Sequence, residues 1–208
     1  MRVVGVDGCP GGWVAVSWDV EARTLTPVVH GSFPALLAAY PDAAVIGVDI
    51  PVGLAANGPR RCDVEARKVL GPRRSSVFPA PHPDVLDAPT YAEALALSHT
   101  LTAKGISRQG FAIYAKVAEV NRVFTLELQR RVFEVHPEVS FWALAGQRPM
   151  VHHKGKTEGF DERRALLAAG LDGAAIPTRP EARGIARPAK SDDVLDAIVA
   201  AWTAHRLG

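Results

Sequence analysis

Two short apolar runs, each ending in an aspartate, dominate the hydrophobic pattern of the chain. The first covers residues 3–6 and precedes Asp7, and the second covers residues 43–50 and carries Asp49 near its end. Because the apolar residues are continuous rather than alternating, both runs predict strands that are buried on both faces. A carboxylate at the end of such a strand must meet solvent, a cation or hydrogen-bond donors. The two aspartates are therefore candidates for a functional site.

The residues that follow Asp7 predict a meander. A turn rich in glycine and proline, residues 8–12, leads into residues 13–18, which we expect to pair antiparallel with the first strand. Residues 24–31 predict a third strand. Because Pro27 cannot donate to a ladder, we expect this third strand at an edge of the sheet.

A helix and a parallel strand follow the meander. Ser32 is a suitable N-cap for a helix that runs to about Tyr40. The strand at residues 43–50 then returns parallel to the first strand. This order of elements indicates an α/β fold. It places Asp7 and Asp49 at the same end of the sheet, where open α/β sheets usually bind ligands.

The middle of the chain is predicted to be helical. Apolar spacing and helix stop residues predict helices at residues 60–70, 91–101 and 107–129, with a loop at residues 78–89. We therefore expect residues 51–130 to form a helical insertion, or cap, between two strands of a single domain that spans residues 1–208.

The last third of the chain predicts one more strand and a terminal helix. The strand, residues 131–137, contains the carboxylate Glu134. Helices are expected at residues 138–145 and 161–169, followed by an irregular segment at residues 178–189. The terminal helix should begin after Ser191 as its N-cap.

The composition is that of an ordinary globular protein. A chain of 208 residues with 48% hydrophobic residues can form one domain with a real core. The net charge of only +2 means that any nucleic-acid-binding surface must be local. Two cysteines make neither a disulfide framework nor a zinc site. No apolar run approaches the roughly 18 residues of a membrane span, and no signal peptide is visible, so we expect a cytoplasmic protein with no membrane partner.

The terminal helix adds two more acids to the candidate site. Asp193 and Asp196 are three residues apart and share one face of the helix. Small residues on the same face, Ala197 and Ala200, would let the helix approach the sheet closely. The acids would then lie near Asp7 and Asp49 at the end of the sheet.

A group of four or five carboxylates points to divalent cations. Unpaired carboxylates repel one another, and their pKa values rise. Mg²⁺ or Mn²⁺ removes this conflict, because hard cations prefer oxygen ligands. Two such ions about 3.5–4 Å apart can activate a water molecule and stabilise the leaving oxygen in phosphodiester cleavage. We expect Asp7, Asp49 and Asp193 to bind the metal, with Glu134 and Asp196 as further catalytic candidates.

Each acid also has a simpler interpretation. Asp7 and Asp49 could be turn or cap residues, and the acids that begin the terminal helix could favour its positive end. Glu134 could be an exposed charge at a sheet edge. The combination of two apolar strands ending in aspartate, a strand with a glutamate and an Asp-x-x-Asp helix is more specific than any member alone.

Basic residues that could contact a phosphate group are concentrated in two places. The denser stretch starts at residue 60, and a shorter one surrounds residue 154. A solvated helical face is an equal alternative for the first stretch. The substrate-binding candidates are Arg60, Arg61, Arg67, Arg74 and Lys154.

The chain resembles the DUF429 proteins, which are described as predicted nucleases of the ribonuclease H-like fold. The resemblance rests on five motifs across nearly the whole chain: Gly5–Trp13, Gly47–Pro51, Arg61–Arg67, Phe133–Glu138 and Asp192–Ala197. It implies a ribonuclease H-like, mixed five-stranded sheet in the order 3-2-1-4-5, with strand 2 antiparallel and helices on both faces. The helical insertion would lie between strands 4 and 5.

The wider superfamily includes the Holliday-junction resolvases. Their final helix carries two acids three residues apart, and Asp193 and Asp196 are similar. Their opening and fourth strands supply acids, as Asp7 and Asp49 would here. The fifth strand, which carries Glu134, is not a usual ligand position in the resolvases.

Together these features lead us to expect a metal-dependent phosphodiester hydrolase that uses Mg²⁺ or Mn²⁺ and acts on nucleic acid. Two alternatives stay open. One is an actin-like domain that binds ATP or phosphate, and the other is a non-catalytic module that binds nucleic acid or a partner protein. The protein could also form a homodimer.

Overall fold

The computed structural model describes residues 1–208, which form two compact units. The sheet unit comprises Met1–Ile50 and Thr125–Gly208, and the helical unit comprises Pro51–Phe124. Each unit has a hydrophobic cluster of its own. The interpretation of residues 1–208 as a single domain stays a prediction.

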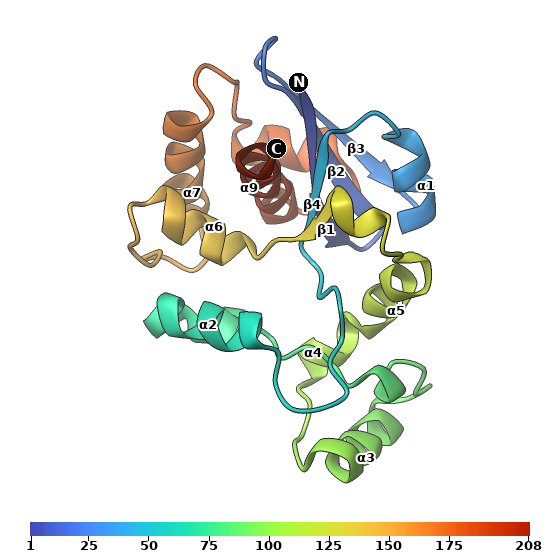
Figure 1. Cartoon of the computed structure of the whole chain (residues 1–208). Helices are drawn as coiled ribbons and strands as arrows, with labels where there is room; N and C mark the ends of the chain where they lie inside the picture. Colours follow the sequence, from blue (N-terminus) through green and yellow to red (C-terminus); the bar gives the residue numbers. More distant parts are fainter. The chain divides into compact units, whose positions relative to one another are not determined.

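The sheet unit is built on a mixed five-stranded sheet in the order β3-β2-β1-β4-β5, which confirms the expected order (Figure 1). Strands β1, β2 and β3 form an antiparallel meander, whereas β4 and β5 run parallel to β1. The edge position of β3 fits its Pro27. The strands span Arg2–Cys9 (β1), Gly12–Asp19 (β2), Thr24–His30 (β3), Val45–Val48 (β4) and Val132–Glu134 (β5).

The long C-terminal helix α9, Ser191–Leu207, packs on one face of the sheet against β1, β2 and β4. The approach is close because both contacting surfaces lack large side chains. A Cβ atom on Gly5 of β1 would collide with the backbone of Ala197 and Ala201. A Cβ atom on Gly47 of β4 would lie 2.8 Å from the carbonyl oxygen of Ala200. The small residues of both elements therefore set the distance between helix and sheet.

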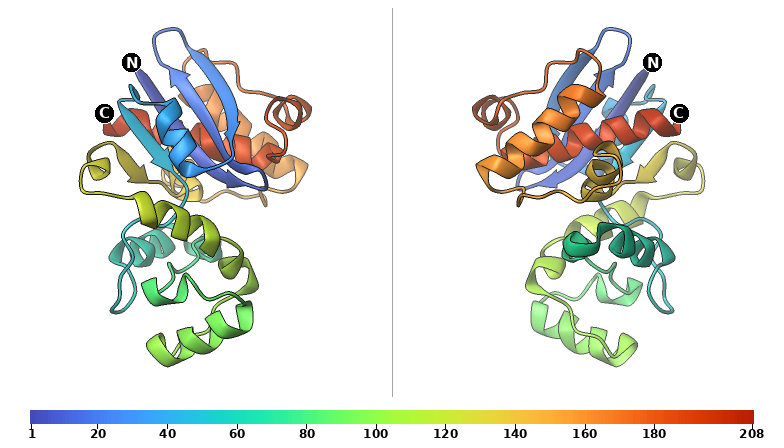
Figure 2. Two further views of the ribbon diagram at one scale, coloured as in Figure 1. Left: turned by 90° about the vertical axis from the view of Figure 1, so that its right-hand side faces the viewer. Right: turned by 90° about the vertical axis from the view of Figure 1, so that its left-hand side faces the viewer.

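Helices cover both faces of this sheet, as expected. Helix α1, Phe33–Ala39, begins after its N-cap Ser32 and lies on the face opposite α9, where Phe33 contacts Trp13 with ring centroids 5.3 Å apart. The two views in Figure 2 show α1 in front of the sheet in one and α9 in front of it in the other. Three further helices pack around α9: α6 (Pro137–Leu144), α7 (Thr157–Gly170) and α8 (Arg179–Ile185).

Two details near the C-terminus correct the sequence interpretation. The segment at residues 178–189 is not irregular throughout, because Thr178 and Glu181 form a capping box that starts α8. The N-cap of α9 is Lys190 rather than Ser191. The carboxylate of Asp193 accepts the backbone N–H of Lys190 (2.8 Å), so the acid takes over the capping that was expected of the serine.

The helical unit contains four α-helices and two short 3₁₀ segments. The single helix expected at residues 107–129 is wrong. The chain turns at Ile113, where the backbone N–H donates to Gly110 (3.3 Å) in a tighter turn. The α-helices span Arg61–Leu70 (α2), Tyr91–Thr102 (α3), Arg108–Ala112 (α4) and Tyr114–Val123 (α5), and the 3₁₀ segments span Gly71–Ser76 (η1) and Pro83–Val85 (η2).

Aromatic packing explains the break between α4 and α5. Phe111 lies against Tyr91 on one side and Tyr114 on the other, with ring centroids 5.7 Å and 5.6 Å apart. A straight helix would follow the apolar period, but this tertiary contact outweighs local propensity. Across the whole chain, no helix combines the length and apolarity needed to cross a bilayer.

Candidate metal centre

Strand register brings Asp7 and Asp49 side by side at the carboxyl end of the sheet. Val6 and Val48 are paired residues of the parallel strands β1 and β4. The backbone N–H of Asp49 then donates to the carbonyl oxygen of Val6 (2.9 Å), which continues the ladder past the end of β4. The two aspartates follow this pair, so their side chains lie on the same face of the sheet. That face is the one on which α9 packs.

Helix α9 adds Asp196 to this pair. Asp196 lies in the second turn of the helix and is only 2% exposed. Carboxylate oxygens of Asp7, Asp49 and Asp196 all lie within 4.8 Å of one another. These three aspartates are far apart in the sequence, and we refer to them as the carboxylate triad. Their convergence depends on the close approach of α9 to β1 and β4.

The triad is electrostatically unfavourable as it stands. The pKa of Asp7 is raised well above its usual value. Burial is the main cause, and the negative charges of Asp49 and Asp196 add to it. Burial also raises the pKa of Asp49 to about 6, an effect that the nearby His136 opposes. A shared positive charge would relieve this conflict.

Lys154 supplies one positive charge at the triad. Its Nζ lies 2.5 Å from Oδ2 of Asp196, and its side chain remains 42% exposed. The negative charge of Asp196, with further contributions from Asp7 and Asp49, raises the pKa of Lys154 although burial opposes this. Lys154 thus forms an internal ion pair in this structure, and the phosphate contact expected for it stays a prediction.

The loop that carries Lys154, residues 151–156, is held from several sides. Both carboxylate oxygens of Glu162 accept backbone N–H groups of this loop, from Val151 (2.8 Å) and His152 (2.9 Å). The guanidinium of Arg163 donates to the carbonyl oxygen of His152 (3.2 Å). Arg179 donates to the carbonyl oxygen of Gly155 (2.9 Å). Lys154 is therefore presented by an anchored loop.

A buried ion pair fixes the helices behind this loop. Arg163 of α7 lies 2.8 Å from both carboxylate oxygens of Glu138 on α6, and both side chains are nearly inaccessible to solvent. Such a pair is costly to break, because removing one partner leaves a buried charge. The sequence analysis assigned no role to either residue, and no pattern in the sequence relates them.

Asp193 lies one helical turn before Asp196 and outside the triad. Its carboxylate accepts the N–H of Lys190, and burial raises its pKa to about 6 although this hydrogen bond opposes the shift. The structure thus brings Asp196, and not Asp193, within 4.8 Å of Asp7 and Asp49. The metal-ligand role expected for Asp193 stays a prediction.

Glu134 points to the other face of the sheet. It is paired with Val48, the residue before Asp49, so its side chain alternates away from the face that carries the triad. Its charge is only a minor contribution to the raised pKa of Asp49. The structure thus does not bring Glu134 into the triad.

Four of the five basic candidates lie in the helical unit. Arg60, expected to bind phosphate, is instead buried and forms an ion pair with Asp63 (NH2 to Oδ1, 2.5 Å). Arg67 donates to the carbonyl oxygen of Val77 (2.7 Å). Arg61 and Arg74 are exposed.

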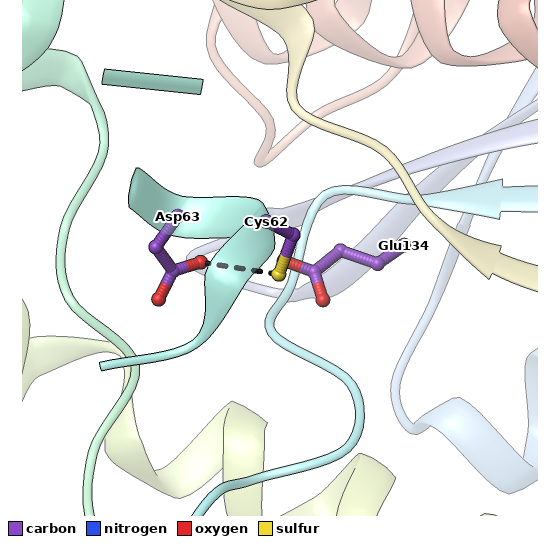
Figure 3. A group of neighbouring side chains, drawn as sticks. All are labelled: Cys62, Asp63 and Glu134. Carbon is purple, nitrogen blue, oxygen red and sulfur yellow. Dashed lines mark hydrogen bonds between the residues drawn. The ribbon is translucent and has the colours of Figure 1, made fainter. Parts of the chain in front are cut away.

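The Arg60–Asp63 pair organises the start of α2. Asp63 also accepts the N–H of Ala80 (3.2 Å), and Arg60 also donates to the carbonyl oxygen of Val52 (3.0 Å). Figure 3 shows Asp63 beside Cys62, whose thiol lies 3.7 Å from Oδ1 of Asp63. Glu134, which the figure also labels, belongs to the sheet unit. The motif at residues 61–67 thus includes residues that stabilise the helical unit.

The donor set of the triad fits a hard divalent cation. Three carboxylates supply oxygen ligands and an excess of negative charge, which is what Mg²⁺ and Mn²⁺ select. No histidine or cysteine belongs to the triad, so its chemistry does not favour zinc.

A family comparison agrees with the motifs identified in the sequence. Residues 5–208 match the family model described as "Protein of unknown function (DUF429)". The chain therefore belongs to the DUF429 family. No curated protein and no solved structure matches the chain.

Proposed function

We propose that this protein is a metal-dependent phosphodiester hydrolase that cleaves nucleic acid. The observation that carries the proposal is the convergence of Asp7, Asp49 and Asp196 within 4.8 Å at the carboxyl end of the sheet. The raised pKa values of Asp7 and Asp49 support it, because they mark a site in which carboxylates are held together against their mutual repulsion. Asp7 lies in β1 and Asp196 in α9, and Asp49 directly follows β4 with its backbone N–H bonded to Val6, so regular structure positions all three groups.

The fold supports an assignment to the ribonuclease H-like class. The sheet order, the antiparallel β2 and the terminal helix with Asp193 and Asp196 are the features on which the resemblance to nucleases of that class rests. Fold alone does not define an activity, so the chemistry must be argued from the triad.

In the proposed reaction, Mg²⁺ or Mn²⁺ bound by the triad supplies an activated water molecule and stabilises charge on the leaving oxygen. The triad residues Asp7, Asp49 and Asp196 hold the reacting groups in place from three rigid elements. Lys154 pairs with Asp196 until the acid is needed as a ligand, and its partly exposed ammonium group can then face a phosphate oxygen.

The direct test is cleavage of DNA and RNA oligonucleotides by purified protein with Mg²⁺ or Mn²⁺. We expect cleavage by the wild type and a loss of at least a hundredfold in Asp7→Asn, since removal of a group that stabilises transition-state charge has effects of roughly this size. Asp161→Asn, an exposed change on α7, is the matched control and should leave the rate unchanged. Equal rates in wild type and Asp7→Asn would remove the triad from the reaction.

The two alternatives stay predictions with tests of their own. An actin-like domain should be stabilised by ATP in a thermal-shift assay. A non-catalytic module should bind nucleic acid in a salt-dependent manner without any turnover.

A further inference from the structure

A basic pocket lies beside the start of α9. Its volume is about 600 Å³, and four cationic side chains line it, against the single carboxylate of Asp192. The four are Arg179, Arg183, Arg187 and Lys190. The net charge of the whole chain is only +2, so this local excess of positive charge is a distinct feature of the surface.

Two of these arginines have no partner within the protein. Arg183 and Arg187 are exposed and make no hydrogen bond or ion pair in the structure. The nearest acid in the sequence, Glu181, is committed elsewhere, because its Oε2 accepts the N–H and the hydroxyl of Thr178 (both 2.7 Å). The capping box of α8 thus occupies Glu181 and leaves Asp192 as the only carboxylate that lines the pocket.

The spacing of the arginines places like charges close to one another. Residues 179, 183 and 187 are four apart, so within α8 the first two lie on one face of the helix. Like charges at this spacing destabilise a helix unless an anion lies between them. A pocket lined by unpaired guanidinium groups is suited to phosphate, which accepts two parallel hydrogen bonds from one arginine.

Arg179 connects the pocket to the carboxylate triad. It donates to Thr157 and to the carbonyl oxygen of Gly155, and Gly155 also lines the pocket. Gly155 follows Lys154, which pairs with Asp196 of the triad. On the other wall, Ser191 and Asp192 directly precede Asp193. The pocket is therefore lined by residues that directly adjoin Lys154 on one segment and Asp193 on the other.

We propose that this pocket binds backbone phosphates of a nucleic-acid strand next to the phosphodiester that lies at the triad. The inference rests on the proposed function and identifies where the substrate lies. Charge complementarity favours this occupant, because a strand offers several phosphates to a pocket that four cationic side chains line. The basic stretch at residues 60–74, from which the sequence analysis expected phosphate contacts, is not needed for this role.

The experiment is binding of a fluorescein-labelled single-stranded oligonucleotide, DNA and RNA in parallel, measured by anisotropy in EDTA. The variant is Arg183→Gln/Arg187→Gln, and both side chains are exposed, so circular dichroism should confirm a normal fold. The matched control is Arg2→Gln/Arg130→Gln. It removes two exposed arginines, the first residue of β1 and a residue shortly before β5, at the opposite end of the sheet. An ionic-strength-matched inorganic phosphate titration tests whether a free anion is the real occupant.

We expect the pocket variant to bind about tenfold more weakly, with the slope of log affinity against log salt reduced by about 1.4, as expected for two lost single-strand phosphate contacts. The control should keep the wild-type slope. Equal binding by both variants, no binding by the wild type, or displacement by phosphate alone would each overturn the inference.

Cleavage is measured separately on the wild type with Mg²⁺, so the two proposals can fail independently. A protein that cleaves but loses no affinity in the pocket variant would refute the pocket and leave the hydrolase. A protein that binds through the pocket but never cleaves would refute the hydrolase and leave the pocket.

Discussion

At the scale of single residues, the candidate site is a balance between buried acids and one lysine. Asp196 is almost inaccessible and would be an unpaired buried charge without Lys154. A metal ion bound by the triad would take over the role of this lysine. Lys154 and a metal bound in this way would therefore compete for Asp196.

This competition gives the first prediction. Lys154→Met should lower the melting temperature in EDTA, because it leaves Asp196 buried without a positive partner, a change that costs about 3–5 kcal/mol in other buried pairs. It should also tighten Mn²⁺ binding, measured by isothermal titration calorimetry.

Lys156→Met is the matched control, since Lys156 is an exposed lysine of the same loop. It should change neither quantity. Unchanged or weaker Mn²⁺ binding in Lys154→Met would show that the lysine supports the metal and does not compete with it.

The second prediction concerns pH. Burial places the pKa of Asp49 at about 6 in the folded protein, above its ordinary value of 3.8. The folded state therefore holds more protons than the unfolded state between these values. The stability that this proton provides is complete below about pH 4 and is lost as the pH rises through about 6.

Asp49→Asn removes the titrating group. In EDTA at pH 7.5 the variant should melt about 2–4 °C above the wild type if about 1 kcal/mol is recovered, and the difference should vanish at pH 4.5. Asp42→Asn, in an exposed turn, should have no effect at either pH. If the variant melted below the wild type at pH 7.5, the buried charge of Asp49 would not destabilise the folded protein, and the prediction would be wrong.

The sequence predicts some of these residues better than others. Asp7 and Asp49 could be identified because a carboxylate at the end of a buried strand is rare enough to require an explanation. The sequence could not show that Asp196, rather than Asp193, lies beside Asp7 and Asp49, because helical spacing gives the shared face of the helix but not the depth of each side chain. The pairing of Lys154 with Asp196 spans 42 positions, and no local pattern reports such a contact.

At the scale of elements, the contact between α9 and the sheet assembles the site. Gly5 and Gly47 lie on adjacent strands in register and both face α9. Their missing side chains let Asp196 reach the two strand-borne aspartates. Any added bulk here should move the helix away from the triad.

The third prediction follows from this contact. Gly5→Ala places a methyl group against the backbone of Ala197 and Ala201, which cannot yield as a side chain could. We expect a loss of about 1–3 kcal/mol or more, as for overpacked cores, measured by urea denaturation. Gly31→Ala, where nothing lies within 4 Å of the added carbon, should be nearly neutral. Similar stability for both variants would contradict the close packing.

Elements with strong local patterns were predicted well, and elements that depend on tertiary contacts were not. The position of β3 at the edge follows from Pro27 alone, and α1 from the cap at Ser32. The break at Ile113 depends on how Phe111 packs against Tyr91, twenty residues earlier. Helix α8 was missed because its composition, rich in arginine and proline, conceals a capping box.

At the scale of the whole molecule, charge and chain order combine into one surface. The first fifty residues supply two acids of the triad, and the last eighteen supply the third. The arginines of the basic pocket lie just before those last residues. A nearly neutral chain can therefore place acids and unpaired cations next to each other, an arrangement suited to a metal and a polyanion together.

The helical unit supplies none of the acids of the triad. Its position in the chain order, between β4 and β5, separates Asp49 from Glu134 in the sequence without separating their strands in the sheet. Its buried Arg60–Asp63 pair stabilises the unit itself. The phosphate contacts expected in this unit stay a prediction, and the proposed binding pocket lies instead at the start of α9.

The central claim is that the triad holds a divalent cation, and anomalous diffraction from Mn²⁺-soaked crystals tests it most directly. We predict an anomalous peak coordinated by Asp7, Asp49 and Asp196, with Lys154 withdrawn from Asp196. Full Mn²⁺ occupancy elsewhere, or no peak with the Lys154–Asp196 pair intact, would contradict the account.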